Sequence, residues 1–195
     1  MKRSFTILLI GVVLLASALA TWYLLPKPVV STESFEEDLG GWTKDADVPP
    51  DPNNPGHDVA WDISRVTSLA YSGQYSVEIY IDGKQDDGTV WIEKRLFVKN
   101  SSRIQVEVSF QFHSEQESFN VIAGVCAFVG NSDPAVEADF TVLGPANEVA
   151  GWKKYTHTAT LTTGSTGEVW VALGITVRWE TEMTYHIDDV KVEIA

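Results

Sequence analysis

The sequence predicts an all-β fold, an antiparallel β-sandwich of the galactose-binding-like jelly-roll kind. Two observations predict it. After Pro28, hydrophobic and polar residues alternate with a period of two, the pattern of a strand with one buried face, while helical periodicity is rare. Turn signals rich in Gly, Pro, Asn and Asp separate these runs. Eight or more strands without intervening helices are typical of a sandwich.

The segment from 103 to 113 shows this alternation most clearly. Its apolar side consists of Ile104, Val106, Val108, Phe110 and Phe112. Residues 75–81 repeat the pattern, and further strands are expected at 89–98, 120–129, 137–143, 152–161, 168–179 and 184–194. The long connections 43–60 and 143–151 suit the crossings of a jelly roll rather than a plain meander.

The N-terminal 25 residues form a separate hydrophobic segment. Lys2 and Arg3 precede an uncharged run that is long enough to cross a bilayer as a helix. Ala18-Leu19-Ala20 also fits a signal-peptidase site, so cleavage stays an alternative. We expect residues 1–25 to be a membrane anchor or signal peptide, 26–32 a linker and 33–195 the jelly-roll domain. Either reading places the domain outside the cytoplasm, membrane-anchored or secreted.

The net charge excludes one class of partner, and the single cysteine indicates a structural rather than a reactive thiol. The formal net charge is −13, and removing the two positive charges of the first 25 residues leaves −15 on the remainder. Such a domain repels nucleic acid, which we exclude as a partner. The single cysteine, Cys126, lies in an apolar run with no adjacent base or cation, as expected of a buried structural thiol.

Four segments, in order, resemble carbohydrate-binding modules of families four, nine and twenty-two. They are Phe35-Glu36 followed by Gly41-Trp42, then 68–76, then Gly151-Trp152-Lys153-Lys154-Tyr155, and finally Ile187-Asp188-Asp189-Val190. The resemblance spans residues 33–195. It implies the jelly-roll fold, a polysaccharide or glycan as partner, and core positions for Trp42 and Trp152.

In the families that this chain resembles, a structural calcium ties the first strand to the last. The matching positions are Glu36, the Ser72-Gly73 turn and Asp188, with Asp189 as a possible substitute. Carboxylates and backbone carbonyls at a Gly turn supply the hard oxygen ligands that Ca²⁺ takes. The alternative is that Asp188 accepts hydrogen bonds from backbone amides.

Outward-facing tryptophans predict the ligand site. Trp91 alternates with Val90 and Ile92, and Trp170 with Val169 and Val171, so both are expected to point away from the core. The remaining candidates are Arg178, on the same face of its strand as Trp170, and Gln105, Glu107 and Gln111 on the polar side of 103–113. The alternative is that the tryptophans are core or edge covers. Exposure of both on one concave face favours glycan binding. If both are buried, or side chains fill that groove, a structural or protein-interaction role is favoured instead.

The sequence does not predict an enzyme. Glu137-Ala138-Asp139 begins like the E-x-D-x-x-E strand of jelly-roll glucanases, but Val142 replaces the final carboxylate. We therefore expect a non-catalytic extracytoplasmic domain that binds a glycan with a structural calcium. The second hypothesis is a cell-surface structural or protein-interaction jelly roll without sugar binding, whose partner is another cell-surface protein.

Overall fold

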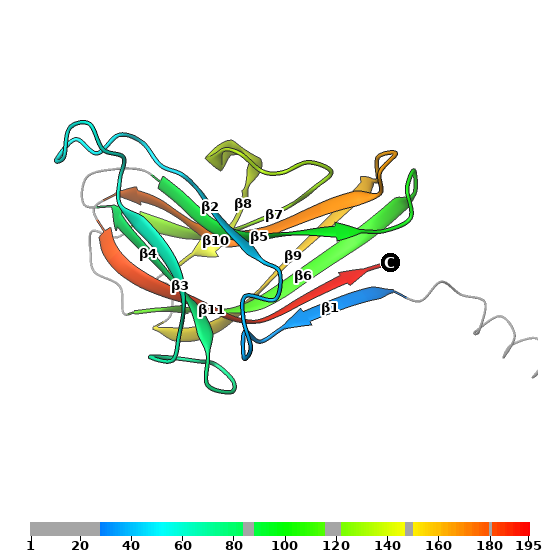
Figure 1. Cartoon of the computed structure of the whole chain (residues 1–195), viewed down its shortest axis with the longest axis horizontal. Coiled ribbons are helices and arrows are strands. Elements are labelled where there is room, and N and C mark those ends of the chain that lie inside the picture. Colours follow the sequence, from blue (N-terminus) through cyan, green and yellow to red (C-terminus); the bar gives the residue numbers. More distant parts are fainter. Residues whose placement is uncertain (1–27, 84–87, 116–121, 147–149, 180) are drawn as a thin grey trace, which may run out of the picture.

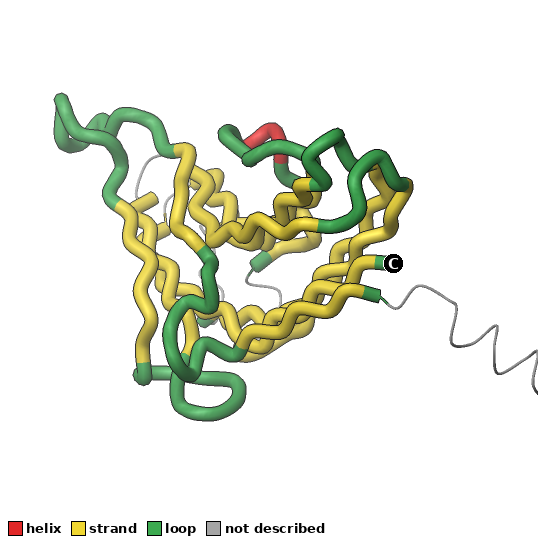
Figure 2. The backbone as a smooth tube through the Cα atoms, turned by 45° about the vertical axis from the view of Figure 1, so that its right-hand side comes forward, coloured by secondary structure: helices red, strands yellow, loops and turns green. Residues whose placement is uncertain are grey.

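The chain folds into two antiparallel β-sheets packed face to face, as the alternation predicts (Figures 1 and 2). The computed structural model describes residues 28–83, 88–115, 122–146, 150–179 and 181–195. The predicted anchor or signal peptide, residues 1–25, lies outside the described residues. In the part of the chain that is described, no helix has the length and hydrophobicity needed to cross a membrane.

The six-stranded sheet contains both ends of the domain. Its order is β3-β4-β11-β6-β9, with β1 also paired to β11. These strands are β1 (Val29–Glu33), β3 (Trp61–Val66), β4 (Ser76–Gly83), β6 (Arg103–Ser114), β9 (Gly151–Thr162) and β11 (Thr181–Ile194). β4 pairs with β11 as far as Ile187, and β1 pairs with it from Val190 onward, so β1 and β11 run side by side (Figure 1).

The five-stranded sheet has the order β2-β5-β10-β7-β8. Its strands are β2 (Thr43–Asp47), β5 (Gly88–Phe97), β7 (Ile122–Gly130), β8 (Thr141–Pro145) and β10 (Glu168–Trp179). The connection from β7 to β8 contains a single turn of 3₁₀ helix, η1 (Glu137–Asp139). This connection lies over the five-stranded sheet, on the side away from the other sheet (Figure 2).

One hydrophobic core fills the space between the sheets. The apolar side of β6 faces it as predicted, from Ile104 to Phe112. From the other sheet, β10 contributes Val169, Val171, Leu173, Ile175 and Val177. Because side chains alternate along a strand, the residues between these positions point to the outer face of each sheet. Cys126 is free and buried, as expected, and its burial raises the pKa of the thiol.

The structure corrects several predicted boundaries. β1 begins at Val29, inside the predicted linker, and β2 lies inside the predicted loop 43–60. β3 was not predicted at all. All three strands lie at sheet edges and pair with a single neighbouring strand. Because few of their side chains are buried in a regular face, their hydrophobic alternation is weak. The predicted strand 137–143 begins as η1, and the paired strand β8 begins only at Thr141.

Candidate functional site

Asp188 is the centre of a clamp between the last strand and the 71–75 turn. Its side chain is fully buried. One carboxylate oxygen, Oδ2, accepts the backbone N–H groups of Tyr71 (2.8 Å) and Ser72 (3.0 Å), and Oδ1 accepts the N–H of Asp189 (2.7 Å). Burial raises the pKa of Asp188, and these amide bonds partly offset the rise.

Asp189, the next residue along β11, extends the clamp. Asp189 accepts a hydrogen bond from the Ser72 hydroxyl (2.7 Å). Its φ of 47° coincides with the irregularity in the pairing of β11 with β6, between Asp188 and Lys191. This irregularity of the strand turns the carboxylates of Asp188 and Asp189 toward the 71–75 turn, as a β-bulge does.

Glu36 holds the other half of the same turn. Its Oε1 accepts the N–H groups of Gln74 (2.9 Å) and Tyr75 (3.0 Å). Arg65 on β3 donates to the carbonyl oxygens of Phe35 and Glu36, and its guanidinium lies 3.2 Å from the centroid of the Tyr75 ring. The first segment of the domain, the turn and the last strand are thus tied together, as the resemblance implies.

The donor set only partly fits calcium. Glu36 and Asp188 do converge on the Ser72-Gly73 turn, but three of their four carboxylate oxygens face N–H donors rather than further oxygens. Among the described residues, no group of three or more His, Cys, Asp or Glu side chains is arranged to hold a metal ion. The hydrogen bonds therefore account for the clamp without a metal, which is the alternative considered for Asp188. Calcium stays a prediction.

The predicted ligand residues divide between the two outer faces of the sandwich. Trp91, Trp170 and Arg178 belong to β5 and β10, whereas Gln105, Glu107 and Gln111 belong to β6. Each group alternates with core residues of its own sheet, so the two groups point in opposite directions. The expectation that the polar side of β6 completes the tryptophan surface is therefore wrong. The strand pattern shows which face a residue occupies but not which sheet its strand joins.

Trp91 lies on the outer face, as predicted, but it is fully buried. Phe140 covers it, with ring centroids 4.9 Å apart and planes at 52°. The indole Nε1–H donates to Glu93 Oε2 on the same strand (2.7 Å). The β10 residue opposite Trp91 is Gly174, which leaves room for the indole. Trp91 therefore lies on the predicted face, but Phe140, from another segment of the same chain, covers its ring.

Trp170 lies on the same face at its open end and is half-buried. Arg95, its partner across β5, lies between two rings, with its guanidinium 5.6 Å from the centroid of Trp170 and 5.3 Å from that of Phe97. Phe97 is 61% exposed. It was missed among the candidates, although its alternation with Leu96 and Val98 places it beside Arg95.

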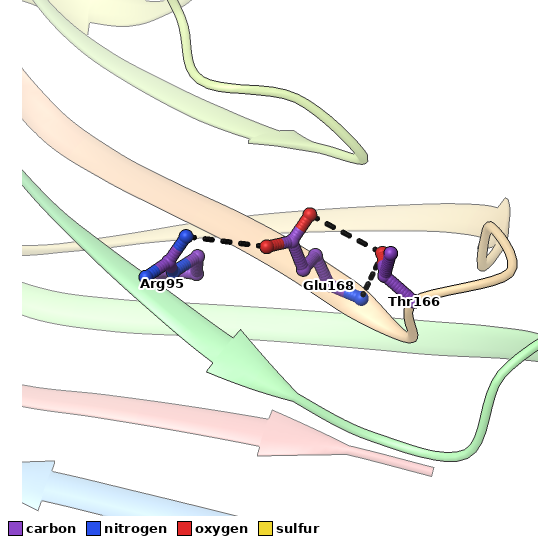
Figure 3. Close-up of polar contacts among 3 residues, drawn as sticks. All are labelled: Arg95, Thr166 and Glu168. Carbon is purple, nitrogen blue, oxygen red and sulfur yellow. Dashed lines mark hydrogen bonds and ion pairs between the residues drawn. The ribbon is translucent and has the colours of Figure 1, made fainter.

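A short polar chain fixes Arg95 (Figure 3). Glu168 Oε1 accepts from the guanidinium at 3.2 Å, and Glu168 Oε2 accepts from the Thr166 hydroxyl at 3.2 Å. The backbone N–H of Glu168 donates in turn to the Thr166 hydroxyl (3.4 Å). Glu168 thus orients the exposed Arg95 side chain beside Trp170.

Arg178 lies toward the other end of β10 and forms an ion pair with Glu137 of η1. The carboxylate of Asp139, also in η1, accepts the N–H groups of Ala135 and Val136. Both carboxylates of the glucanase-like fragment are therefore engaged in holding the β7–β8 connection. Arg178 shares a face with the tryptophans, as predicted, but its contact is with the chain's own acidic residue.

The β6 candidates lie on the outer face of the six-stranded sheet. Gln105 and Glu107 are exposed and line a depression of about 270 Å³ together with Pro28, Glu193 and Ala195. Gln111 is half-buried and pairs with Asp188 and Lys154 on the neighbouring strands. Among the described residues, no aromatic ring lines this depression, so it lacks the stacking surface that the tryptophans were expected to provide.

The same outer face carries an aromatic cluster that was not predicted. Trp152, expected in the core, is instead half-buried there, because the strand pairing sets it opposite His113 on β6. It contacts Tyr71, His113 and His186, with ring centroids 5.6, 5.2 and 6.5 Å away. Burial, followed by the charge of His113, lowers the pKa of His186 to about 4. The cluster covers the sheet surface beside the Asp188 clamp.

The fold is that of carbohydrate-binding modules. The CBM22-1 xylan-binding domain of Paenibacillus barcinonensis Xyn10C superposes with a TM-score of 0.50 at 15% identity, over 87% of this chain and 97% of that chain. TmCBM27, described for specific mannan recognition, gives a TM-score of 0.50 at 11% identity, over 86% and 98%. No protein-family model and no curated protein matches the sequence. The resemblance is thereby confirmed at the level of the fold.

Proposed function

We propose that this domain binds a glycan without transforming it, through the outer face of the five-stranded sheet. One observation carries the proposal. At the open end of that face, the half-buried ring of Trp170 lies beside an arginine held in place by Glu168 and next to an exposed Phe97. Of the two outer faces, this one carries both predicted tryptophans.

The chemistry of this end suits a sugar. A pyranose ring has an apolar face of C–H groups and a rim of hydroxyls, so it needs a flat hydrophobic ring beside fixed hydrogen-bonding groups. Trp170 offers the ring, while Arg95 and Glu168 offer charged donors and an acceptor, which form the stronger hydrogen bonds. Because Glu168 already contacts Arg95, part of the side-chain entropy of Arg95 is lost before a ligand binds (Figure 3).

The similar structures suggest the first ligands to test. One is described as binding xylan and the other as recognising mannan. We propose a polysaccharide chain as the ligand class here, with xylan and mannan oligosaccharides as probes. Glu137 and Asp139, which begin the glucanase-like pattern, hold the β7–β8 connection, which supports a non-catalytic role.

The proposed location is outside the cytoplasm, with residues 1–25 as a membrane anchor or signal peptide. Its support is the uncharged run after Lys2 and Arg3, whose flanking positive charges favour the cytoplasmic side. A polysaccharide ligand is consistent with an extracytoplasmic domain. Immunodetection of the C-terminus on intact cells tests this location, and protection of that epitope until the membrane is permeabilised contradicts it.

Replacing Trp170 with alanine is expected to weaken binding of whichever oligosaccharide binds the wild type by at least about tenfold. The variant loses the stacking ring at the open end, and a tenfold change corresponds to about 1.4 kcal/mol. Titration calorimetry on the full-length chain measures it. Trp152→Ala is the matched control, since it removes a half-buried tryptophan from the opposite outer face. Equal losses from both variants contradict the assignment, as does a wild type that binds no polysaccharide on a glycan array.

A protein-interaction role is the second candidate, and one observation favours it. Trp91 is covered by Phe140, so the face is open only toward Trp170 and Phe97. A surface with an exposed phenylalanine beside an arginine also suits a protein contact, in which aromatic residues and Arg are enriched. Absence of glycan binding, together with retention of a cell-surface protein by the wild type but not by Phe97→Ala, favours this candidate.

A further inference from the structure

The β7–β8 connection occupies the centre of the proposed binding face. We call residues 131–140 the covering segment. Phe140 lies on Trp91 and also contacts Phe128, with ring centroids 6.0 Å apart. The Glu137 N–H donates to Asp47 Oδ2 on β2 (2.8 Å), and the Glu137 carboxylate pairs with Arg178 on β10. Figure 2 shows this segment, with its short helix, above the sheet.

We propose that the covering segment is a displaceable lid, and that Phe140 occupies the place on Trp91 that a sugar ring takes when the lid opens. The inference rests on the proposed function, because it assigns the ligand of the opened face. The proposed binding face then has two parts: an open end at Trp170, and a centre at Trp91 that the closed lid covers.

The lid is weakly attached to the body of the domain. Most of its residues are exposed, with Pro134 buried and Glu137 and Phe140 partly buried. Several of its hydrogen bonds are internal, such as those from the Asp139 and Phe140 N–H groups to the carbonyls of Val136 and Glu137. Segments with few buried contacts open at a free energy well below that of global unfolding. Opening the segment breaks no strand pairing, because β8 begins only at Thr141.

Beside Trp91 and Phe128, the surface of the five-stranded sheet also carries buried polar groups. Thr89 and Thr176 lie opposite each other on β5 and β10, and Thr89 also lies opposite Asp47 on β2, the residue that accepts the hydrogen bond from η1. Both are buried, and neither hydroxyl has a hydrogen-bond partner within the described residues. A permanently buried layer rarely leaves such groups unpaired, because each costs free energy. A ligand or water that enters on opening satisfies them.

A buried carboxyl group, that of Glu93, also destabilises the closed lid when it is ionised. It is buried beside Trp91, and desolvation, helped by the charges of Asp133 in the lid and Asp45 on β2, raises its pKa to about 7. The β10 residue opposite Glu93 is the uncharged Ala172, and Thr43 lies opposite on β2. The Trp91 indole, which donates to Glu93, only partly offsets the rise in pKa. Ionisation of Glu93 therefore places a third negative charge beside Asp133 and Asp45.

This arrangement makes closure pH-dependent, with a defined sign. Glu93 binds its proton more tightly in the closed state, where the pKa is near 7, than in an open, hydrated state near the ordinary 4.5. Closure is most favourable below pH 4.5, weakens as the pH rises toward 7, and is constant above it. Within that window the closing equilibrium changes by at most about tenfold per pH unit.

Hydrogen exchange of the full-length chain, kept in mild detergent because of its N-terminal hydrophobic run, tests the lid without a ligand. We expect the protection factors of amides in 135–140, corrected for intrinsic exchange, to fall at least about tenfold from pH 5 to pH 8, while those of β5 and β10 stay constant. Glu93→Gln, a neutral mimic of the protonated acid, is expected to keep the pH 5 protection at pH 8. Phe140→Ala is expected to lose protection at both pH values, and Val136→Ala, an exposed change in the same segment, to leave it unchanged.

Titration with xylan and mannan oligosaccharides then separates the lid from the proposed function. Phe140→Ala is expected to bind at least about threefold tighter than the wild type at pH 5, because less of the binding energy is used to open the lid. If hydrogen exchange shows that the lid opens but neither oligosaccharide binds, the result supports the lid and contradicts the glycan proposal. Protection in 135–140 equal to that of β10, unaffected by pH and by Phe140→Ala, overturns the lid even where the probes bind at Trp170.

Discussion

Replacing Asp188 with alanine is expected to lower the free energy of unfolding by about 4 kcal/mol, among the largest effects of any single substitution in this domain. The change removes the acceptor of three backbone N–H groups, from Tyr71, Ser72 and Asp189, and leaves them beside a buried position. Hydrogen bonds to a charged group contribute about 1.5–3 kcal/mol each, and their losses at one site are not fully additive.

Urea denaturation of the wild type and the variant measures this difference. Asp51→Ala is the matched control, because its carboxylate accepts one exposed local N–H, from Asn53, and its loss is expected to cost under about 1 kcal/mol. The same curves recorded with excess chelator and with added calcium test the predicted metal. A midpoint that calcium raises in the wild type but not in Asp188→Ala supports calcium at the clamp, and a midpoint unchanged by either addition removes it. Equal stability of Asp188→Ala and the wild type contradicts the clamp itself.

The second large effect is expected at Gly174, where alanine is predicted to cost about 3 kcal/mol or more. A Cβ there lies 2.1 Å from the Val90 carbonyl oxygen and 2.7 Å from the Trp91 Cβ, contacts that require the paired strands to move. Overpacking of this kind typically costs 1–3 kcal/mol, and backbone clashes lie at the upper end of that range. The clash also pushes Trp91 out of the slot that Gly174 leaves for it.

Thermal and urea unfolding of Gly174→Ala check this expectation. Gly164→Ala is the control, because a Cβ at that position meets no atom within 4 Å, and we expect a change within about 0.5 kcal/mol. A Gly174→Ala variant as stable as this control means that β5 and β10 are not paired in the register that sets Gly174 opposite Trp91.

The alternation of hydrophobic residues predicted the central strands of each sheet better than the edge strands. Central strands such as β6 and β10 have one face in the core, so their alternation is strong and their predicted limits are close to those observed. β1, β2 and β3 are edge strands with few buried side chains, and pairing with a neighbour defines them. Long-range pairing of this kind leaves little trace in a local pattern.

The candidate site was predicted in part, for the same reason. Alternation correctly placed Trp91, Trp170 and Arg178 on one outer face. It did not show that β6 joins the other sheet, which separates Gln105 and Glu107 from the tryptophans. Nor does any local pattern show that Phe140, 49 positions after Trp91, folds back onto it. Glu36 and Asp188 were correctly matched to one turn, where both carboxylates accept backbone N–H groups, and calcium at that turn stays a prediction.

The proposal that the outer face of the five-stranded sheet binds glycan is tested most directly by the tryptophan indole N–H signals of the full-length chain. Assigned ¹⁵N–¹H spectra recorded during titration with xylan and mannan oligosaccharides report which ring meets the ligand. We predict that the signal of Trp170 shifts first, that Trp91 follows with a larger shift at pH 8 than at pH 5, and that Trp42 and Trp152 do not shift. Shifts confined to Trp152, on the opposite face, or no shift with any oligosaccharide, contradict it.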